Sequence, residues 1–169
     1  HFNQIEWYRN QSALFTQNNQ GKAVTALAFL HIPLIEYKNV IDRASTIGNN
    51  LESAISSPRI NSGLFGSFID MKDVMGVFAG HDHNNDYIGM EYGIALAYGR
   101  VTGADAYGSL ERGGRVIELY EGKPQFDTWI STPTVSEPVF YYPSALNSND
   151  EETMTYLPAK NVSPTKHGV

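Results

Sequence analysis

The chain has 169 residues, enough for one ordinary domain, with 41% apolar and 18% charged residues, which argues against wholesale disorder. The net charge of -6 gives no general attraction to nucleic acid or to an anionic membrane. No cysteine is present, which excludes disulfides and thiolate metal sites, and no run approaches the ~20 apolar residues of a membrane segment. The composition is compatible with a periplasmic or secreted location and equally with a cytoplasmic one.

The first half of the chain predicts helices that alternate with buried strands. Apolar residues recur at three- and four-residue steps in the helical segments, and the strands are nearly continuous apolar runs. The polar stretch 36–61 predicts a long loop with one short helix at 51–56. In chain order, the expected elements are a helix at 3–18, a strand at 23–30, a helix at 62–71 and a strand at 74–79.

After residue 86 the apolar pattern changes to a period of two, which is typical of half-buried strands. Glycine-rich turns separate the strands and predict an antiparallel meander. The expected strands are 87–92, 94–98, 115–120 and 126–131. The fold class is therefore α/β (α+β). We expect one domain at 1–132 and an extended or partly disordered tail at 133–169.

Three histidines lie at the carboxyl ends of predicted buried strands. His31 follows the first strand, and His81 and His83 follow the second, directly after Gly80. Residues two apart on an extended backbone project to the same side, so His81 and His83 can face one cavity. Neutral imidazole binds Zn, Fe or Mn, and ligand sites in α/β sheets gather at the carboxyl ends of strands. The alternative is that these histidines are hydrogen-bonded structural residues.

The polar residues around the histidine pair admit two interpretations. Asp82, Asn84 and Asp86 carry oxygen atoms that could orient the imidazole rings through hydrogen bonds. The alternative for Asp82 and Asp86 is that they are simply turn residues. Arg100 follows a predicted strand and could bind a phosphate oxygen in bidentate fashion. The alternative for Arg100 is a structural ion pair with an acidic residue such as Asp86 or Glu91.

The histidine segments resemble motifs of a known family. The segment 80–83 resembles the G-H-x-H motif of calcineurin-like metallophosphoesterases, and 31–34 resembles the single strand-end histidine that precedes it. The flanking sequence resembles the purple-acid-phosphatase-related phosphohydrolases in particular, over residues 4–131. The runs that carry this resemblance are 31–37, 61–65, 77–86, 98–103 and 114–117.

The resemblance implies a two-metal hydrolase of phosphate monoesters or diesters. It implies two packed β-sheets flanked by helices, with two divalent or trivalent ions, commonly Mn, Fe or Zn. By the same resemblance, His31 and His81 would bind one ion and His83 the other. The substrate would be a phosphoester, with Arg100 as a candidate contact.

The earlier motifs of that family, D-x-H, G-D-x-x-D and G-N-H, do not occur in the chain. We therefore expect the chain to be the C-terminal part of a longer phosphoesterase, inactive in isolation, with the missing N-terminal half as its partner. An uncovered apolar sheet face would favour a homo-oligomer. Two alternatives stay open: a non-catalytic module that binds one metal or a partner, and a mononuclear zinc hydrolase.

Overall fold

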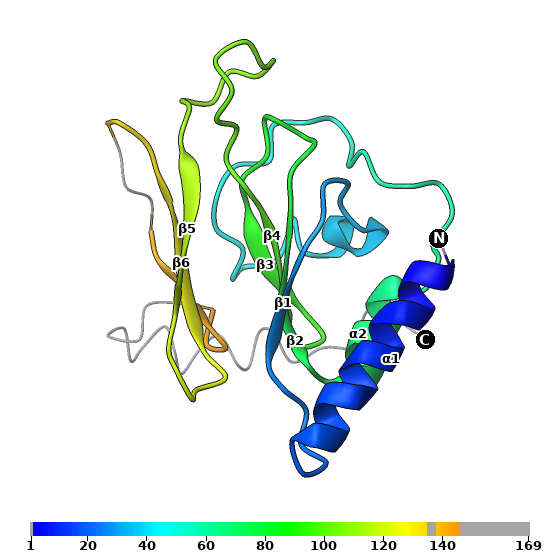
Figure 1. Ribbon diagram of the computed structural model, residues 1–169. Helices are drawn as coiled ribbons and strands as arrows, with labels where there is room; N and C mark the ends of the chain where they lie inside the picture. The colour runs from blue at the N-terminus through cyan, green and yellow to red at the C-terminus, as the bar shows by residue number, and fades with distance from the viewer. Residues whose placement is uncertain (1, 135–137, 146–169) are drawn as a thin grey trace.

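The computed structural model describes residues 2–134 and 138–145, which form two α-helices and two β-sheets (Figure 1). Most elements lie within a few residues of their predicted places. In chain order they are α1 (Phe2–Asn18), β1 (Ala26–Phe29), the 3₁₀ helix η1 (Ile35–Asn39), α2 (Leu64–Met71), β2 (Val74–Ala79), β3 (Ile88–Glu91), β4 (Ile94–Tyr98), β5 (Gly114–Leu119), β6 (Phe126–Ser131) and β7 (Phe140–Tyr142).

The first sheet has four strands in the order β1-β2-β4-β3. β1, β2 and β4 are parallel, and β3 is antiparallel to β4. This corrects the prediction of one antiparallel meander after residue 86, because β4 lies beside β2 and belongs to the first sheet. The β3–β4 hairpin is antiparallel as expected, but only β5, β6 and β7 form a separate antiparallel sheet. β7 lies in the range expected to be a tail, most of which (135–137 and 146–169) is outside the described residues.

Side chains on the two faces of the first sheet enter different clusters of the core. Successive residues of a strand point to opposite faces, so Val77 and Phe78 of β2 belong to separate clusters. Val77 shares its cluster with Phe68 of α2, and Phe78 packs against Phe126 of β6 with ring centroids 5.8 Å apart. The helices therefore cover one face of the sheet and the second sheet covers the other (Figure 1).

Helix α1 packs on α2 through a narrower face than its sequence predicts. Tyr8 meets Phe68 edge-on at 5.0 Å between ring centroids, and its hydroxyl donates to Asp73. Three further apolar residues of this helix, Trp7, Leu14 and Phe15, are exposed. Within the described residues, no helix combines the length and apolar character needed to cross a membrane.

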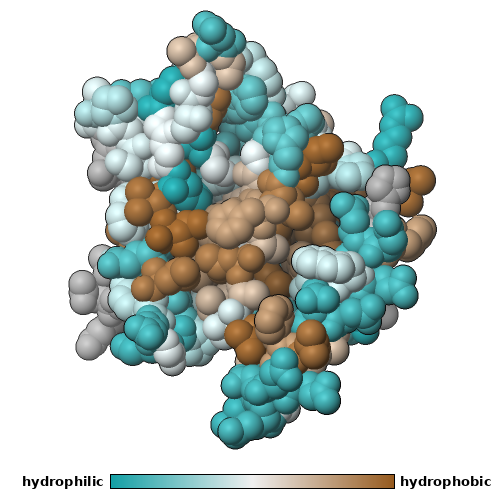
Figure 2. All heavy atoms as spheres, viewed as in Figure 1, coloured by the Kyte–Doolittle hydropathy of each residue, from teal (hydrophilic) through white to brown (hydrophobic). Residues whose placement is uncertain are grey.

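Two other predictions need correction. The strand predicted at 23–30 is shorter and less buried than expected: β1 pairs only with β2, and Phe29 is 67% exposed. In Figure 2, apolar atoms gather at the centre of the face where Figure 1 places β1. The helix expected at 51–56 does not form, and the long segment before α2 contains the 3₁₀ helix η1 instead.

Candidate metal centre

His31 and His81 are brought together by the parallel pairing of β1 and β2. The backbone ladder continues past the end of β1, because Leu30 N–H donates to the Phe78 carbonyl at 2.9 Å. Gly80 N–H then donates to the His31 carbonyl at 3.1 Å. Both histidines thus lie where the carboxyl ends of two neighbouring strands meet, the usual position for ligands of an α/β sheet.

The two imidazoles face one another through specific nitrogen atoms. His81 Nδ1 lies 3.2 Å from His31 Nε2, and the rings meet edge-on with centroids 5.0 Å apart. One explanation is a hydrogen bond between a protonated and an unprotonated nitrogen. The other is a shared metal ion, since nitrogens at 2.0–2.1 Å from a tetrahedral ion are about 3.3 Å apart. The spacing therefore fits two of the four positions around one ion.

His81 itself has an unusual backbone conformation. Its φ angle of 75° lies in the left-handed region, which costs a non-glycine residue roughly 1–2 kcal/mol. Such conformations cluster at functional sites and persist only where surrounding contacts hold them. Gly80, just before His81, shows no such constraint, because a Cβ there would lie 3.8 Å from His31 Nδ1, an ordinary contact. The backbone strain at His81 is thus a stronger indication of a functional site than Gly80 is.

His83 lies in the same loop but its ring turns to a different neighbour. It stacks on Tyr107 with centroids 4.1 Å apart and an angle of 20° between the rings. Among residues 2–134 and 138–145, no three His, Asp or Glu side chains lie together in a cluster that could hold a metal. The structure thus brings His31 and His81 together without His83, and the role of His83 as a ligand stays a prediction.

Asp82, Asn84 and Asp86 hold the loops around the histidines. The Asp82 carboxylate accepts from Tyr98 O–H at 2.6 Å and from Ser56 N–H at 3.1 Å. Asn84 Oδ1 accepts from the backbone of Ser109 at 2.7 Å. The Asp86 carboxylate accepts from Asn49. These contacts join the three side chains to neighbouring loops, and their role in orienting the imidazoles stays a prediction.

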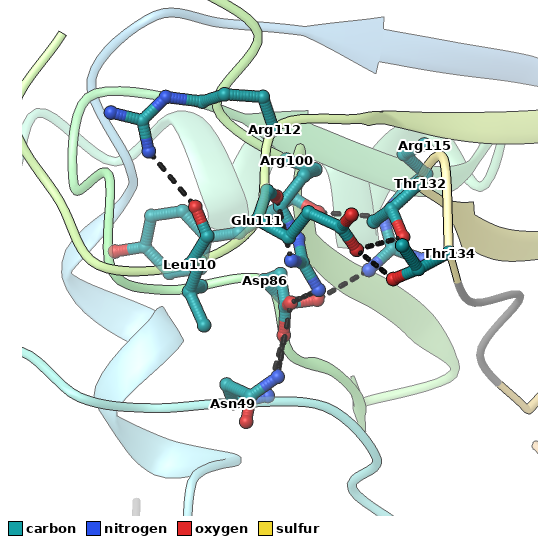
Figure 3. Close-up of polar contacts among 10 residues, drawn as sticks. Asn49, Asp86, Arg100, Leu110, Glu111, Arg112, Arg115, Thr132 and Thr134 are labelled. Atoms are coloured by element: carbon teal, nitrogen blue, oxygen red, sulfur yellow. Dashed lines mark hydrogen bonds and ion pairs between the residues drawn. The ribbon is translucent and has the colours of Figure 1, made fainter.

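Arg100 forms a buried ion pair with Asp86 (Figure 3). Arg100 Nη2 lies 2.5 Å from Asp86 Oδ2, and the two side chains are only 3% and 0% exposed. Nη1 of the same guanidinium donates to the Glu111 carbonyl at 2.9 Å. A group so enclosed is poorly placed for a dissolved phosphoester, so the geometry favours the alternative prediction of a structural pair over substrate binding.

Sequence reasoning missed the tyrosines that support the site. Tyr107 contacts both His81 and His83, and Tyr98 holds Asp82. Burial, followed by the hydrogen bond to Asp82, raises the pKa of Tyr98 well above its ordinary value. No local pattern marks either residue, because their partners are 16 to 26 positions away in the sequence.

Fold and site together define a three-layer α/β chain with paired imidazoles at the ends of its parallel strands. No family model matches the chain, and no solved structure matches it. It is 30% identical over 140 residues to "Probable inactive purple acid phosphatase 14" from Arabidopsis thaliana, covering 78% of this chain and 35% of the relative. The chain is thus a distant homologue of part of the purple-acid-phosphatase-like proteins.

Two further relatives support this relationship. "Probable inactive purple acid phosphatase 29" from Arabidopsis thaliana is 38% identical over 114 residues, which cover 66% of this chain and 29% of the relative. "Phosphatase DCR2" from Saccharomyces cerevisiae is 29% identical over 150 residues, or 81% of this chain and 26% of the relative. The chain therefore spans about a quarter to a third of the length of these relatives. Both a protein named as a phosphatase and proteins named as inactive are among them.

Proposed function

We propose that this chain contributes metal-binding histidines to a two-metal hydrolase of phosphate esters. The observation that carries the proposal is the 3.2 Å approach of His31 Nε2 and His81 Nδ1 at the ends of adjacent parallel strands. The similarity to a yeast protein named as a phosphatase supports phosphate esters as the substrate class.

In this proposal, His31 and His81 share one ion and His83 binds the second, and Mn, Fe or Zn all suit imidazole ligands. Bound ions would supply Lewis-acid polarisation of the phosphoryl oxygens and an acidified water molecule. The role of this chain is to present the imidazoles from a rigid sheet edge. The hydrogen bond from Gly80 to His31 and the enclosed Asp82 keep the two loops in register.

Imidazoles alone would hold two cations poorly, because the repulsion between the ions requires negative ligands. Asp82 and Asp86 are engaged with Tyr98, Asn49 and Arg100, so they are poor candidates for that role. We propose that the carboxylate ligands and the general acid come from another part of a longer protein, as the greater length of the relatives suggests. The isolated chain would then be inactive.

The test is a phosphatase assay on a longer protein that contains this chain, with p-nitrophenyl phosphate and either Mn²⁺ or Zn²⁺. His81→Ala and His31→Ala should each lower kcat/KM by about 100-fold or more, because each removes a group that holds a charge-stabilising ion. Arg9→Ala is the control, since Arg9 forms an exposed ion pair with Asp70. Unchanged kcat/KM in both histidine variants would overturn the proposal.

A second candidate function is a non-catalytic module that binds one metal ion. It is favoured by the two-imidazole site and by relatives that are named as inactive. This candidate predicts that the longer protein binds metal in a manner that depends on His31 and His81, yet does not hydrolyse the phosphoester. Clear hydrolysis that disappears with His81→Ala would exclude it.

A further inference from the structure

Tyr107 contacts the histidine loop with its ring, its hydroxyl and its backbone. Its ring stacks on His83, as described above, while its backbone carbonyl lies 3.1 Å from His83 Nδ1. Its hydroxyl oxygen accepts from His83 N–H at 3.2 Å and donates to the His81 carbonyl at 3.2 Å. Tyr107 therefore contacts both histidines of the H-x-H segment, although it follows His83 by 24 positions and His81 by 26.

The contact with the carbonyl determines which nitrogen of His83 carries the proton. A carbonyl oxygen can only accept a hydrogen bond, so His83 Nδ1 must be the donor. In a neutral imidazole the other nitrogen, Nε2, then has a free lone pair. A metal ion binds only such an unprotonated nitrogen, and a hydrogen bond from the opposite ring nitrogen is the usual device that selects it.

The hydroxyl contacts add a constraint on the backbone. They span the turn at His81, whose φ angle of 75° needs support from surrounding contacts. Tyr107 thus holds the ring of His83 and also the strained peptide that sets the direction of His81.

The loop that carries Tyr107 is itself held in place. The Arg112 guanidinium donates to four carbonyls of this loop, those of Gly103, Ala106, Gly108 and Leu110. Figure 3 shows the last of these contacts. Gly108 lies so close to the histidine loop that a Cβ there would be 3.0 Å from Asn84 Oδ1 and 3.3 Å from His83 Cβ. The position of Tyr107 therefore follows from a packed loop and not from a freely rotating side chain.

We propose that Tyr107 is a positioning residue that fixes His83 in the Nδ1-protonated tautomer and so presents Nε2 to a metal ion. The metal part of this inference rests on the proposed function, whereas the tautomer part does not. The two parts can therefore fail separately.

The test of the tautomer is ¹⁵N NMR of the histidine side chains in the metal-free 169-residue chain, at about pH 8.5, where neutral imidazole predominates. His83, assigned with a His83→Gln variant, should show the Nδ1-protonated pattern. Tyr107→Ala keeps the backbone carbonyl but removes the ring that stacks on the imidazole and holds it against that carbonyl, so it should give a mixture of tautomers. Tyr107→Phe keeps the stacked ring and should retain the Nδ1-protonated pattern. Tyr92→Ala is the matched control, because Tyr92 is 53% exposed and Tyr107 is 55% exposed.

An Nε2-protonated His83 in the unchanged chain would overturn the proposal, and so would an Nδ1-protonated pattern that survives Tyr107→Ala in a folded variant. The metal arm titrates Zn²⁺ into a longer protein that contains this chain, with the same substitutions. Tyr107→Ala should weaken the His83-dependent binding by about 10- to 100-fold, the usual effect of removing a partner of a metal ligand. If no binding depends on His83 while the tautomer result holds, the proposed function fails for the second ion and the positioning role of Tyr107 stands.

Discussion

Asp86 is fully enclosed, and Arg100 supplies the cation that its buried carboxylate requires. Removing one partner of such a pair leaves an uncompensated charge in a poorly solvated place, whereas an exposed pair contributes little. The pair of Arg9 and Asp70 provides an exposed comparison, since these side chains are 43% and 64% exposed.

We therefore predict that Arg100→Leu lowers the free energy of unfolding by about 3–5 kcal/mol. Arg9→Leu should change it by less than ~1 kcal/mol. Urea denaturation of the two variants measures both values. A small effect of Arg100→Leu would show that Asp86 does not depend on this ion pair, and would reopen the possibility that Arg100 binds a ligand.

Three buried tyrosines predict a loss of stability in alkaline solution. Burial is the largest cause that raises the pKa of Tyr37, Tyr87 and Tyr98. The unfolded chain releases these protons near pH ~10, while the folded chain retains them. Stability is therefore complete below about pH 10 and falls as the pH rises above it. Urea midpoints measured from pH ~8 to ~11 should show this decline.

Tyr98→Phe tests the assignment, because phenylalanine does not titrate. The variant should lose stability less steeply above pH ~10 than the unchanged chain. It should also be less stable at neutral pH by about 1–3 kcal/mol, since Asp82 loses the hydrogen bond from Tyr98. If stability falls equally steeply with pH in the variant, groups other than Tyr98 cause the alkaline sensitivity. Tyr92→Phe, at an exposed tyrosine, provides the control.

The sequence predicted the location of the histidines better than their surroundings. His31 and His81 were expected at the carboxyl ends of two strands, because apolar runs mark those strands, and the structure shows that the two strands are paired. The contacts of Tyr107 and Arg112 could not be predicted in this way. They depend on the path of the glycine-containing loop between β4 and β5, and nothing in the local sequence pattern specifies that this loop packs against the histidines.

At the scale of elements, β3 lies against the loop that follows η1. A Cβ on Gly89 would come within 2.4 Å of Thr46 Oγ1 and 2.8 Å of Val40 Cβ, so no side chain fits between the strand and the loop. In contrast, a Cβ on Gly66 in α2 would meet nothing within 4 Å. The two glycines thus differ in what surrounds them.

We predict that Gly89→Ala destabilises the chain by about 1–3 kcal/mol through overpacking. Gly66→Ala should stabilise it by roughly 0.5–1 kcal/mol, because alanine favours the helix. Thermal unfolding of both variants measures the difference. Equal effects of the two substitutions would contradict the described packing of β3 on residues 40–46.

Element types were predicted more reliably than sheet membership. Apolar runs and period-two segments marked the strands β2, β4, β5 and β6, but periodicity does not specify the neighbour of a strand. This is why β4 was expected in a meander, although it lies between β2 and β3. For the same reason β1 was expected to be buried, because an apolar run in an edge strand has the same sequence pattern as one in a central strand.

At the scale of the whole molecule, the outer edge of β1 is the main uncovered apolar surface in Figure 2. Among the described residues, no strand lies on that edge, and Phe29 is exposed where it stacks on Phe78 at 5.3 Å between ring centroids. Exposed apolar edge strands promote association, and a lysine on the edge opposes it.

The chain should therefore self-associate in a concentration-dependent manner, and Phe29→Lys should reduce this association. Sedimentation velocity over a range of concentrations measures it. Ile60→Lys is the control, because Ile60 is an exposed apolar residue in the loop before α2. A chain that stays monomeric at every concentration would contradict the prediction.

The central claim is that His31 and His81 share one metal ion, and Zn²⁺ titration calorimetry of the 169-residue chain tests it most directly. The unchanged chain should bind one Zn²⁺ ion. His31→Ala and His81→Ala should each weaken the affinity for this ion by at least about 10- to 100-fold. The double variant should lose little more than either single variant, because both residues serve the same ion. Zn²⁺ binding that is the same in all four proteins would show that the 3.2 Å approach is only a hydrogen bond between two structural histidines.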